Sequence, residues 1–141
     1  MFLLGGDGKP LTLRFMTAAS FATGIHQIAI PVKDLPRAVA FYRDVVALRF
    51  LFETNGLAFF NCGGVRLMLS KPDRPEHAVS SMLYLGTNDI SGATEALRAG
   101  GARIEAEAHM IARLETVEVW LSHWIDSEGN HMAWMQEKPP A

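Results

Sequence analysis

The same order of secondary-structure signals occurs twice along this chain, and this repeat restricts the fold more than any other feature. Residues 24–71 are predicted to form a strand, an amphipathic helix and three further strands, because apolar residues alternate in the strand segments and follow helical spacing in KDLPRAVAFYRDVVAL. Residues 81–137 repeat this order after a linker at 72–80 that is rich in proline and charge. DLPRAVAFY, from Asp34, also aligns with DISGATEAL, from Asp89. The sequence therefore predicts two tandem βαβββ modules.

The two modules are expected to share one domain. Hydrophobic residues make up 49% of the chain and charged residues 20%, which is enough apolar material for a sizeable core. The domain is predicted to span residues 24–137, with an N-terminal extension at 1–23 and a short tail at 138–141. Within the extension, LTLRF could add an edge strand, and Met16 is an alternative natural start.

Charge and cysteine content argue against several classes of protein. The net charge is −2 and no basic patch carries interleaved aromatic residues, so no nucleic-acid partner is expected. No apolar run approaches the roughly 18–20 residues of a membrane span, so no membrane partner is expected either. Cys62 is the only cysteine, which leaves no internal disulfide and no Cys-based zinc site. A cytoplasmic location agrees with this cysteine usage.

Three segments, in this order, resemble the vicinal oxygen chelate superfamily, the family of glyoxalases, bleomycin resistance proteins and dioxygenases. They are HQIAIPVKDLPRAVAFYRDV, TNDISGATEALRAGGARI and DSEGNHMAWM; the last is similar to the family ending D-P-x-G-N-x-x-E-[LF]. The resemblance implies an α+β fold in which two βαβββ modules form a curved mixed-sheet cup, commonly within a homodimer. In catalytic members it implies a divalent metal in the cup that stabilises an enolate or oxyanion. One departure is Ala47, since the family usually has glycine after the first helix.

Four positions of this chain correspond to the metal ligands of that family. Counting back from VKDL gives Gln27, and counting back from TNDI gives Met82. The strand VRLMLS aligns Met68 with a third ligand, and the DSEGN turn places Ala133 where the family has Glu. None of these residues is a carboxylate or an imidazole, whereas a stable divalent site takes about three or more N or O ligands. We therefore expect no metal cofactor, although a shift of one residue at Gln27 would bring in His26.

Other polar residues are predicted to point into the cup. In the hairpin closed by DSEGN, His123 should face Ala133, and His131 should lie on the same face nearer the turn. Tyr84 and Arg66 each lie two residues from one of the four positions and should share its side of the strand. We interpret these residues mainly as polar wall groups that orient a ligand. Proton transfer by His123 and Tyr84 is the catalytic alternative.

Two further sets of side chains are expected on the helix side of the sheets. His26 is predicted to lie there as a packing residue. The three tryptophans should face the helices or a subunit interface by strand alternation. These are Trp120, Trp124 and Trp134.

Three functions follow from these observations. The favoured one is a protein that binds a small organic molecule in the cup without the divalent metal, as bleomycin-binding relatives do. The predicted ligand-binding residues are Gln27, Arg66, Met68, Met82, Tyr84, His123, His131 and Ala133. The alternative is a lyase, isomerase or dioxygenase acting on a small oxygen-rich metabolite. It would work metal-free through His123 and Tyr84, or with a displaced site for Mn, Ni, Zn or Fe. A purely protein–protein role is the third, and the fold names no substrate.

Overall fold

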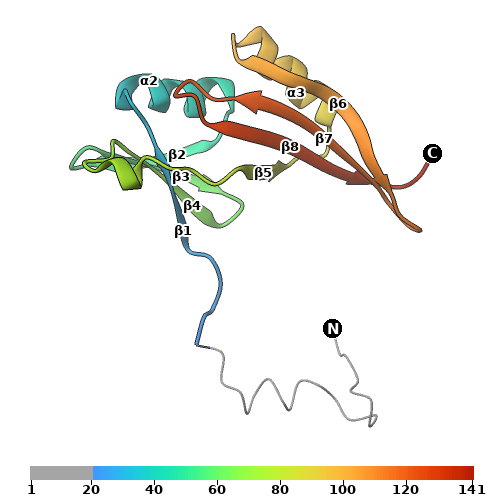
Figure 1. Cartoon of the computed structure of the whole chain (residues 1–141), viewed down its shortest axis with the longest axis horizontal. Coiled ribbons are helices and arrows are strands. Elements are labelled where there is room, and N and C mark those ends of the chain that lie inside the picture. Colours follow the sequence, from blue (N-terminus) through green and yellow to red (C-terminus); the bar gives the residue numbers. More distant parts are fainter. Residues whose placement is uncertain (1–20) are drawn as a thin grey trace.

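The computed structural model describes residues 21–141, and two four-stranded mixed sheets form its frame (Figure 1). The first sheet has the order β1-β4-β3-β2 and consists of β1 (Gln27–Pro31), β2 (Arg49–Thr54), β3 (Leu57–Cys62) and β4 (Val65–Ser70). The second has the order β5-β8-β7-β6 and consists of β5 (Leu83–Gly86), β6 (Arg103–Arg113), β7 (Glu118–Ile125) and β8 (His131–Lys138). In each sheet the first strand pairs in parallel with the last, and the other pairs are antiparallel.

The helices α2 and α3 lie on one side of the sheets, so the opposite faces stay open (Figure 1). α2 spans Leu35–Ala40 and continues into the π-helical turn η1 (Phe41–Val45), and α3 spans Ile90–Ala99. A short 3-10 helix, η2 (Pro75–His77), lies in the linker between the modules. Asp34 and Asp89 cap α2 and α3 by accepting hydrogen bonds from backbone N–H groups at 3.1 and 3.0 Å. This arrangement confirms the α+β fold of two βαβββ modules around an open cup.

The LTLRF segment and Ala47 were two features of the sequence with expected structures. LTLRF lies outside the described residues. Ala47, where the resemblance leads us to expect glycine, has a φ of +64°, which is left-handed backbone that an L side chain adopts at a steric disadvantage. None of the helices within residues 21–141 is long and apolar enough to cross a membrane.

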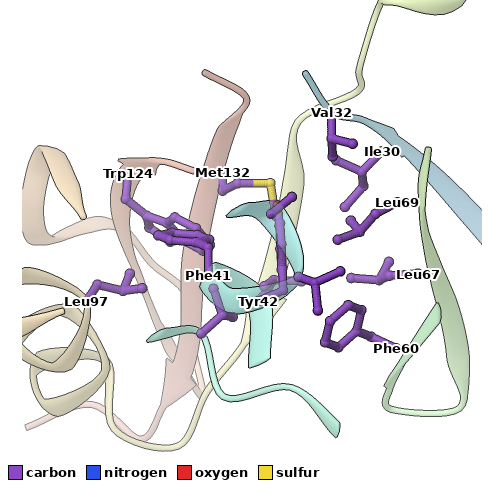
Figure 2. Packing of buried hydrophobic residues seen from close by; sticks show 14 of the residues in the cluster. Ile30, Val32, Phe41, Tyr42, Phe60, Leu67, Leu69, Leu97, Trp124 and Met132 are labelled. Atoms are coloured by element: carbon purple, nitrogen blue, oxygen red, sulfur yellow. The ribbon is translucent and has the colours of Figure 1, made fainter. Parts of the chain in front are cut away.

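One continuous core joins the two modules (Figure 2). Phe41 and Tyr42, from η1, lie between Trp124 of β7 and the side chains of the first sheet (Figure 2). The ring centroids of Phe41 and Trp124 are 6.2 Å apart, and those of Trp124 and Trp134 are 5.6 Å apart. Trp124 and Trp134 therefore face the helix layer, as strand alternation predicted. Trp120 is half-buried against the same cluster.

The DSEGN turn between β7 and β8 connects the second module to the first. Glu128 accepts hydrogen bonds from the backbone N–H groups of Lys33 and Asp34 at 2.8 and 2.9 Å. Its carboxylate also accepts hydrogen bonds from Nε and Nη2 of Arg37 at 2.8 and 3.0 Å. The turn thus holds the start of α2 through a chain of charge-assisted hydrogen bonds.

A second carboxylate of the same turn reaches the core. Asp126 accepts a hydrogen bond from the Tyr42 hydroxyl at 2.7 Å, and burial together with this carboxylate raises the pKa of Tyr42 well above its usual value. Asp126 also accepts from the backbone N–H groups of Glu128 and Asn130. Asn130 in turn donates to the carbonyl of Pro31 at 2.9 Å. The turn therefore fixes the relative position of the two sheets.

Candidate functional site

The open face of the first sheet carries a connected polar group. The strand register sets Gln27 beside Arg66 and Ala29 beside Met68. Arg66 Nε donates to Gln27 Oε1 at 2.9 Å, and Gln27 Nε2 lies 3.5 Å from Met68 Sδ. Three of the predicted ligand-binding residues therefore contact one another, although they come from strands about 40 residues apart in the chain.

Aromatic rings lie next to this group, and the sequence analysis missed them. The guanidinium of Arg66 lies over the Phe59 ring, 5.5 Å from its centroid. Phe52 stacks on Phe59 with centroids 4.6 Å apart. Alternation along LAFFNC puts Phe59 on the open face, but the partner strands that complete the stack could not be identified without the sheet register.

The open face of the second sheet carries the histidines. The register places Tyr84 beside Ala133 and Ala133 beside His123, so the predicted pairing of His123 with Ala133 is confirmed. The His123 ring is 6.3 Å from the His109 ring, whose Nδ1 lies 2.8 Å from the Glu107 carbonyl oxygen. Tyr84 is 53% exposed. Tyr84, Ala133 and His123 thus form a row across β5, β8 and β7.

The remaining predicted residues differ in their access to a ligand. Ala133 is completely buried between its row neighbours, so a ligand reaches it only if side chains around it move. His131 is exposed and pairs with Ile125, nearer the turn than Ala133, as predicted. Met82 is half-buried and lies one residue before β5.

Two cavities meet at Tyr84. One of about 440 Å³ is largely apolar and lies between the first sheet and β5; its lining includes Ile28, Cys62, Leu67, Leu83 and Tyr84. The other, of about 310 Å³, is lined by Tyr84, Asn88, Met135, Glu137 and neighbouring residues. Neither cavity includes Gln27 or His123. A single chain therefore presents two separate surfaces. One is the Gln27 group, formed by Gln27, Arg66 and Met68, and the other is the His123 row, formed by Tyr84, Ala133 and His123.

The residues at the four family ligand positions do not suit a divalent metal ion. Gln27 has the only side-chain oxygen among them, and that oxygen already accepts from a guanidinium, whose positive charge opposes a cation at the same point. The two thioethers are soft, weak ligands. Within residues 21–141, no three His, Cys, Asp or Glu side chains gather where they could share a metal ion.

Two other residues are placed by the structure. Cys62 is half-buried, and burial raises the pKa of its thiol, which does not favour a nucleophilic thiolate. The prediction that His26 packs on the helix side is wrong. His26 precedes β1, is exposed, and lines a cavity of about 260 Å³ together with Asn61 and Arg66.

Comparisons with known proteins agree with this fold. The family model described as Glyoxalase/Bleomycin resistance protein/Dioxygenase superfamily matches residues 24–118. Among curated proteins, the chain is similar to the metallothiol transferase FosB of Staphylococcus haemolyticus (strain JCSC1435), with 35% identity over 48 residues. That match spans 34% of this chain and 34% of the relative, so the chain covers about a third of the length of these curated relatives.

Solved structures share the architecture over most of the chain. TnmS3, an antibiotic binding protein from Streptomyces sp. CB03234, superimposes with a TM-score of 0.67 and 18% identity over 85% of this chain and 100% of its own. Lactoylglutathione lyase from Agrobacterium tumefaciens gives 0.64 and 24% identity over 83% and 96%. At these identities the likeness shows the fold alone.

Proposed function

We propose that this chain, which belongs to the Glyoxalase/Bleomycin resistance protein/Dioxygenase superfamily, binds a small organic molecule in its open cup without a divalent metal. Its residues at the family's ligand positions do not suit a metal ion. The observation that carries this proposal is the 2.9 Å hydrogen bond from Arg66 Nε to Gln27 Oε1. It occupies the one oxygen that the four positions offer, and it sets a cation where a metal would bind.

The side chains of the cup suit a binding surface. Met68 and Met82 are flexible and polarisable, so they adapt to irregular organic ligands. Arg66, Tyr84 and His123 add donors and acceptors that can orient such a ligand. TnmS3, which shares the fold, is an antibiotic binding protein, so this architecture serves ligand binding in one structural neighbour.

We further propose a homodimer in which the open faces of two chains enclose the ligand. The Gln27 group and the His123 row lie on separate sheets of one chain, and each is open to solvent on one side. Apolar side chains at the outer strands of both sheets add contact area for a second copy. Those are Leu51 and Phe52 on β2 and Ile111 on β6. A cytoplasmic location, with no nucleic-acid or membrane partner, remains the expectation from the sequence.

One observation favours metal-free catalysis as the second candidate. His123 shares a row with Tyr84 and lies beside His109, so two imidazoles and a phenol can meet one ligand. An imidazole can take a proton from carbon next to a carbonyl, and a phenol can donate to the oxyanion that forms. This lyase or isomerase alternative predicts that His123→Ala abolishes turnover, whereas a binding protein loses affinity alone.

Binding in the presence of a chelator tests the proposed function. The protein is dialysed against EDTA and screened by thermal shift against oxygen-rich metabolites and aromatic antibiotics. A ligand present at about 100 times its Kd is expected to raise the Tm by roughly 5–10 °C, because it stabilises the folded state by about 2.7 kcal/mol. Calorimetry should give the same Kd with and without added Mn or Zn. Binding that occurs only after metal is restored would contradict the proposal.

A further inference from the structure

Two arginines stand apart from the others in the described part of the chain. Six of the eight arginines between residues 21 and 141 have a carboxylate partner in an ion pair; these are Arg37, Arg43, Arg74, Arg98, Arg103 and Arg113. Arg49 and Arg66 have no carboxylate partner among the described residues. Both are exposed. No carboxylate within residues 21–141 therefore balances their positive charge, which is the condition for binding an external anion.

The strand register brings these two arginines into one row. Arg49 on β2 pairs with Asn61 on β3, which pairs with Arg66 on β4, which lies beside Gln27 on β1. All four side chains therefore point to the open face of the sheet. Neighbouring strands are about 4.8 Å apart, so the backbones of Arg49 and Arg66 are separated by roughly 10 Å. Two arginine side chains span this gap easily, and both can reach one anionic group or two groups of the same ligand.

Arg66 is held in position before any ligand arrives. Its Nε donates to Gln27 Oε1 at 2.9 Å, and its guanidinium lies over the Phe59 ring at 5.5 Å. Its two terminal nitrogens have no partner among the described residues, so they can bind an oxyanion at two points. Fixing a long side chain in advance removes part of the entropy lost on binding.

The surroundings of Arg66 suit an anion that also carries an apolar body. The cavity of about 260 Å³ beside it is lined by His26, Leu51, Asn61, Gly64 and Arg66. Leu51 is 38% exposed, and Phe52, stacked on Phe59, is 44% exposed. A charged end at Arg66 and a flat apolar part against these side chains would both be accommodated.

We propose that the cup selects a small organic oxyanion, a carboxylate, phosphate or phosphonate with a flat apolar body, through Arg66 and Arg49. The oxyanion binds the two guanidinium groups, and the apolar part packs on Leu51 and Phe52. This inference rests on the proposed binding function and specifies its ligand class. An acidic side chain of a second chain is the competing occupant, and ligand binding combined with sedimentation separates the two.

Three naphthalene compounds of similar shape provide the test: 2-naphthoate, 2-naphthyl phosphate and the uncharged 2-naphthamide. Binding to the full chain is measured by calorimetry in EDTA at low and high salt. We expect at least one of the two anions to bind ten times or more tighter than the amide, with the preference reduced at high salt. Comparing the two anions distinguishes a carboxylate site from a phosphate site.

Arginine variants then locate the site. Arg66→Met keeps the apolar stem and removes the charge, and it should weaken binding of the anion about 10- to 100-fold while changing binding of the amide less than twofold. Arg49→Met should have a smaller effect of the same sign. Arg66→Lys should restore part of the affinity. Arg74→Met, in the exposed linker, is the matched control and should leave all three affinities unchanged.

The inference is wrong if the anions and the amide bind with equal affinity, or if Arg66→Met leaves anion binding unchanged. Either result leaves the proposed binding function standing. Failure of all three compounds to bind would also overturn it, whereas the proposed function fails only if the wider metabolite screen finds no binding in EDTA. If Arg66→Met and Arg49→Met dissociate a dimer in sedimentation without changing anion affinity, these arginines bind a partner subunit, and the inference is wrong.

Discussion

Replacing Glu128 by alanine is expected to lower the free energy of unfolding by about 3 kcal/mol. Glu128 is only 5% exposed, and its carboxylate accepts from two backbone N–H groups at the start of α2 as well as from Arg37. Removing it leaves part-buried backbone donors and the Arg37 guanidinium without this partner, and it removes the hydrogen bonds that join the turn to the start of α2. Because the Arg37 side chain is half-exposed, the loss should lie near the lower end of the range for buried ion pairs.

Urea unfolding followed by circular dichroism measures this loss. Glu76→Ala is the matched control, because Glu76 is exposed and its one ion pair within residues 21–141, with Arg74, is 3.9 Å long. That variant should change the free energy of unfolding by less than about 0.5 kcal/mol. A loss of under about 1 kcal/mol in Glu128→Ala would show that the DSEGN turn does not hold the modules together.

The same carboxylate predicts how stability depends on pH. Burial alone raises the pKa of Glu128, but hydrogen bonds from Arg37, Ser127 and the start of α2 outweigh it and hold the pKa at about 2, against 4.5 for an ordinary glutamate. Since the folded-state pKa is the lower one, the stabilisation is complete above pH 4.5 and is lost as the pH falls towards about 2. A difference of this size corresponds to about 3 kcal/mol.

Denaturation curves at pH 7, 4 and 2.5 for the wild type and Glu128→Gln test this. The difference in stability between the two proteins should be constant at neutral pH and shrink as the pH falls below 4.5. A difference that stays constant down to pH 2.5 would contradict the pKa assigned to Glu128.

Replacing Phe41 by alanine is expected to cost about 3–5 kcal/mol. Phe41 is buried where the two modules meet, and its ring lies nearly perpendicular to that of Tyr42 at 5.5 Å and 6.2 Å from that of Trp124, centroid to centroid (Figure 2). Truncation removes these contacts and leaves a cavity that the two packed sheets cannot close. The urea midpoint should fall accordingly.

The matched control for this variant is Phe21→Ala. Phe21 is 92% exposed, so the same change should alter the free energy of unfolding by less than about 0.5 kcal/mol. If Phe41→Ala were as mild as this control, the core shared by the two modules would not be the main contact between them.

Local pattern was sufficient to predict the fold of the modules and the facing pair in the last hairpin. The repeated order of elements gave two βαβββ units, and the DSEGN turn set the register that pairs His123 with Ala133. Both depend on neighbours close in sequence. The parallel pairing of β1 with β4 joins residues 39 positions apart, so the contact of Arg66 with Gln27 was beyond the reach of strand alternation.

The role of Glu128 was missed for the same reason. In the sequence it is one polar residue of a turn, and nothing near it indicates that its partners lie 91 to 95 positions earlier in the chain. Burial was equally hard to foresee at Ala133, because its complete enclosure depends on side chains from neighbouring strands. The alternation of side chains predicted correctly which face of the strand Ala133 lies on, but it could not show that this residue is buried from solvent.

The metal content of the purified protein tests the central claim most directly. Protein prepared without chelator, and without a metal-affinity step, is analysed for Mn, Fe, Ni and Zn against its chain concentration. Because the residues at the family's ligand positions offer one amide oxygen that already binds Arg66, we expect each metal to fall well below one tenth of an equivalent per chain. One equivalent of any of these metals per chain, retained through dialysis, would contradict a metal-free binding cup.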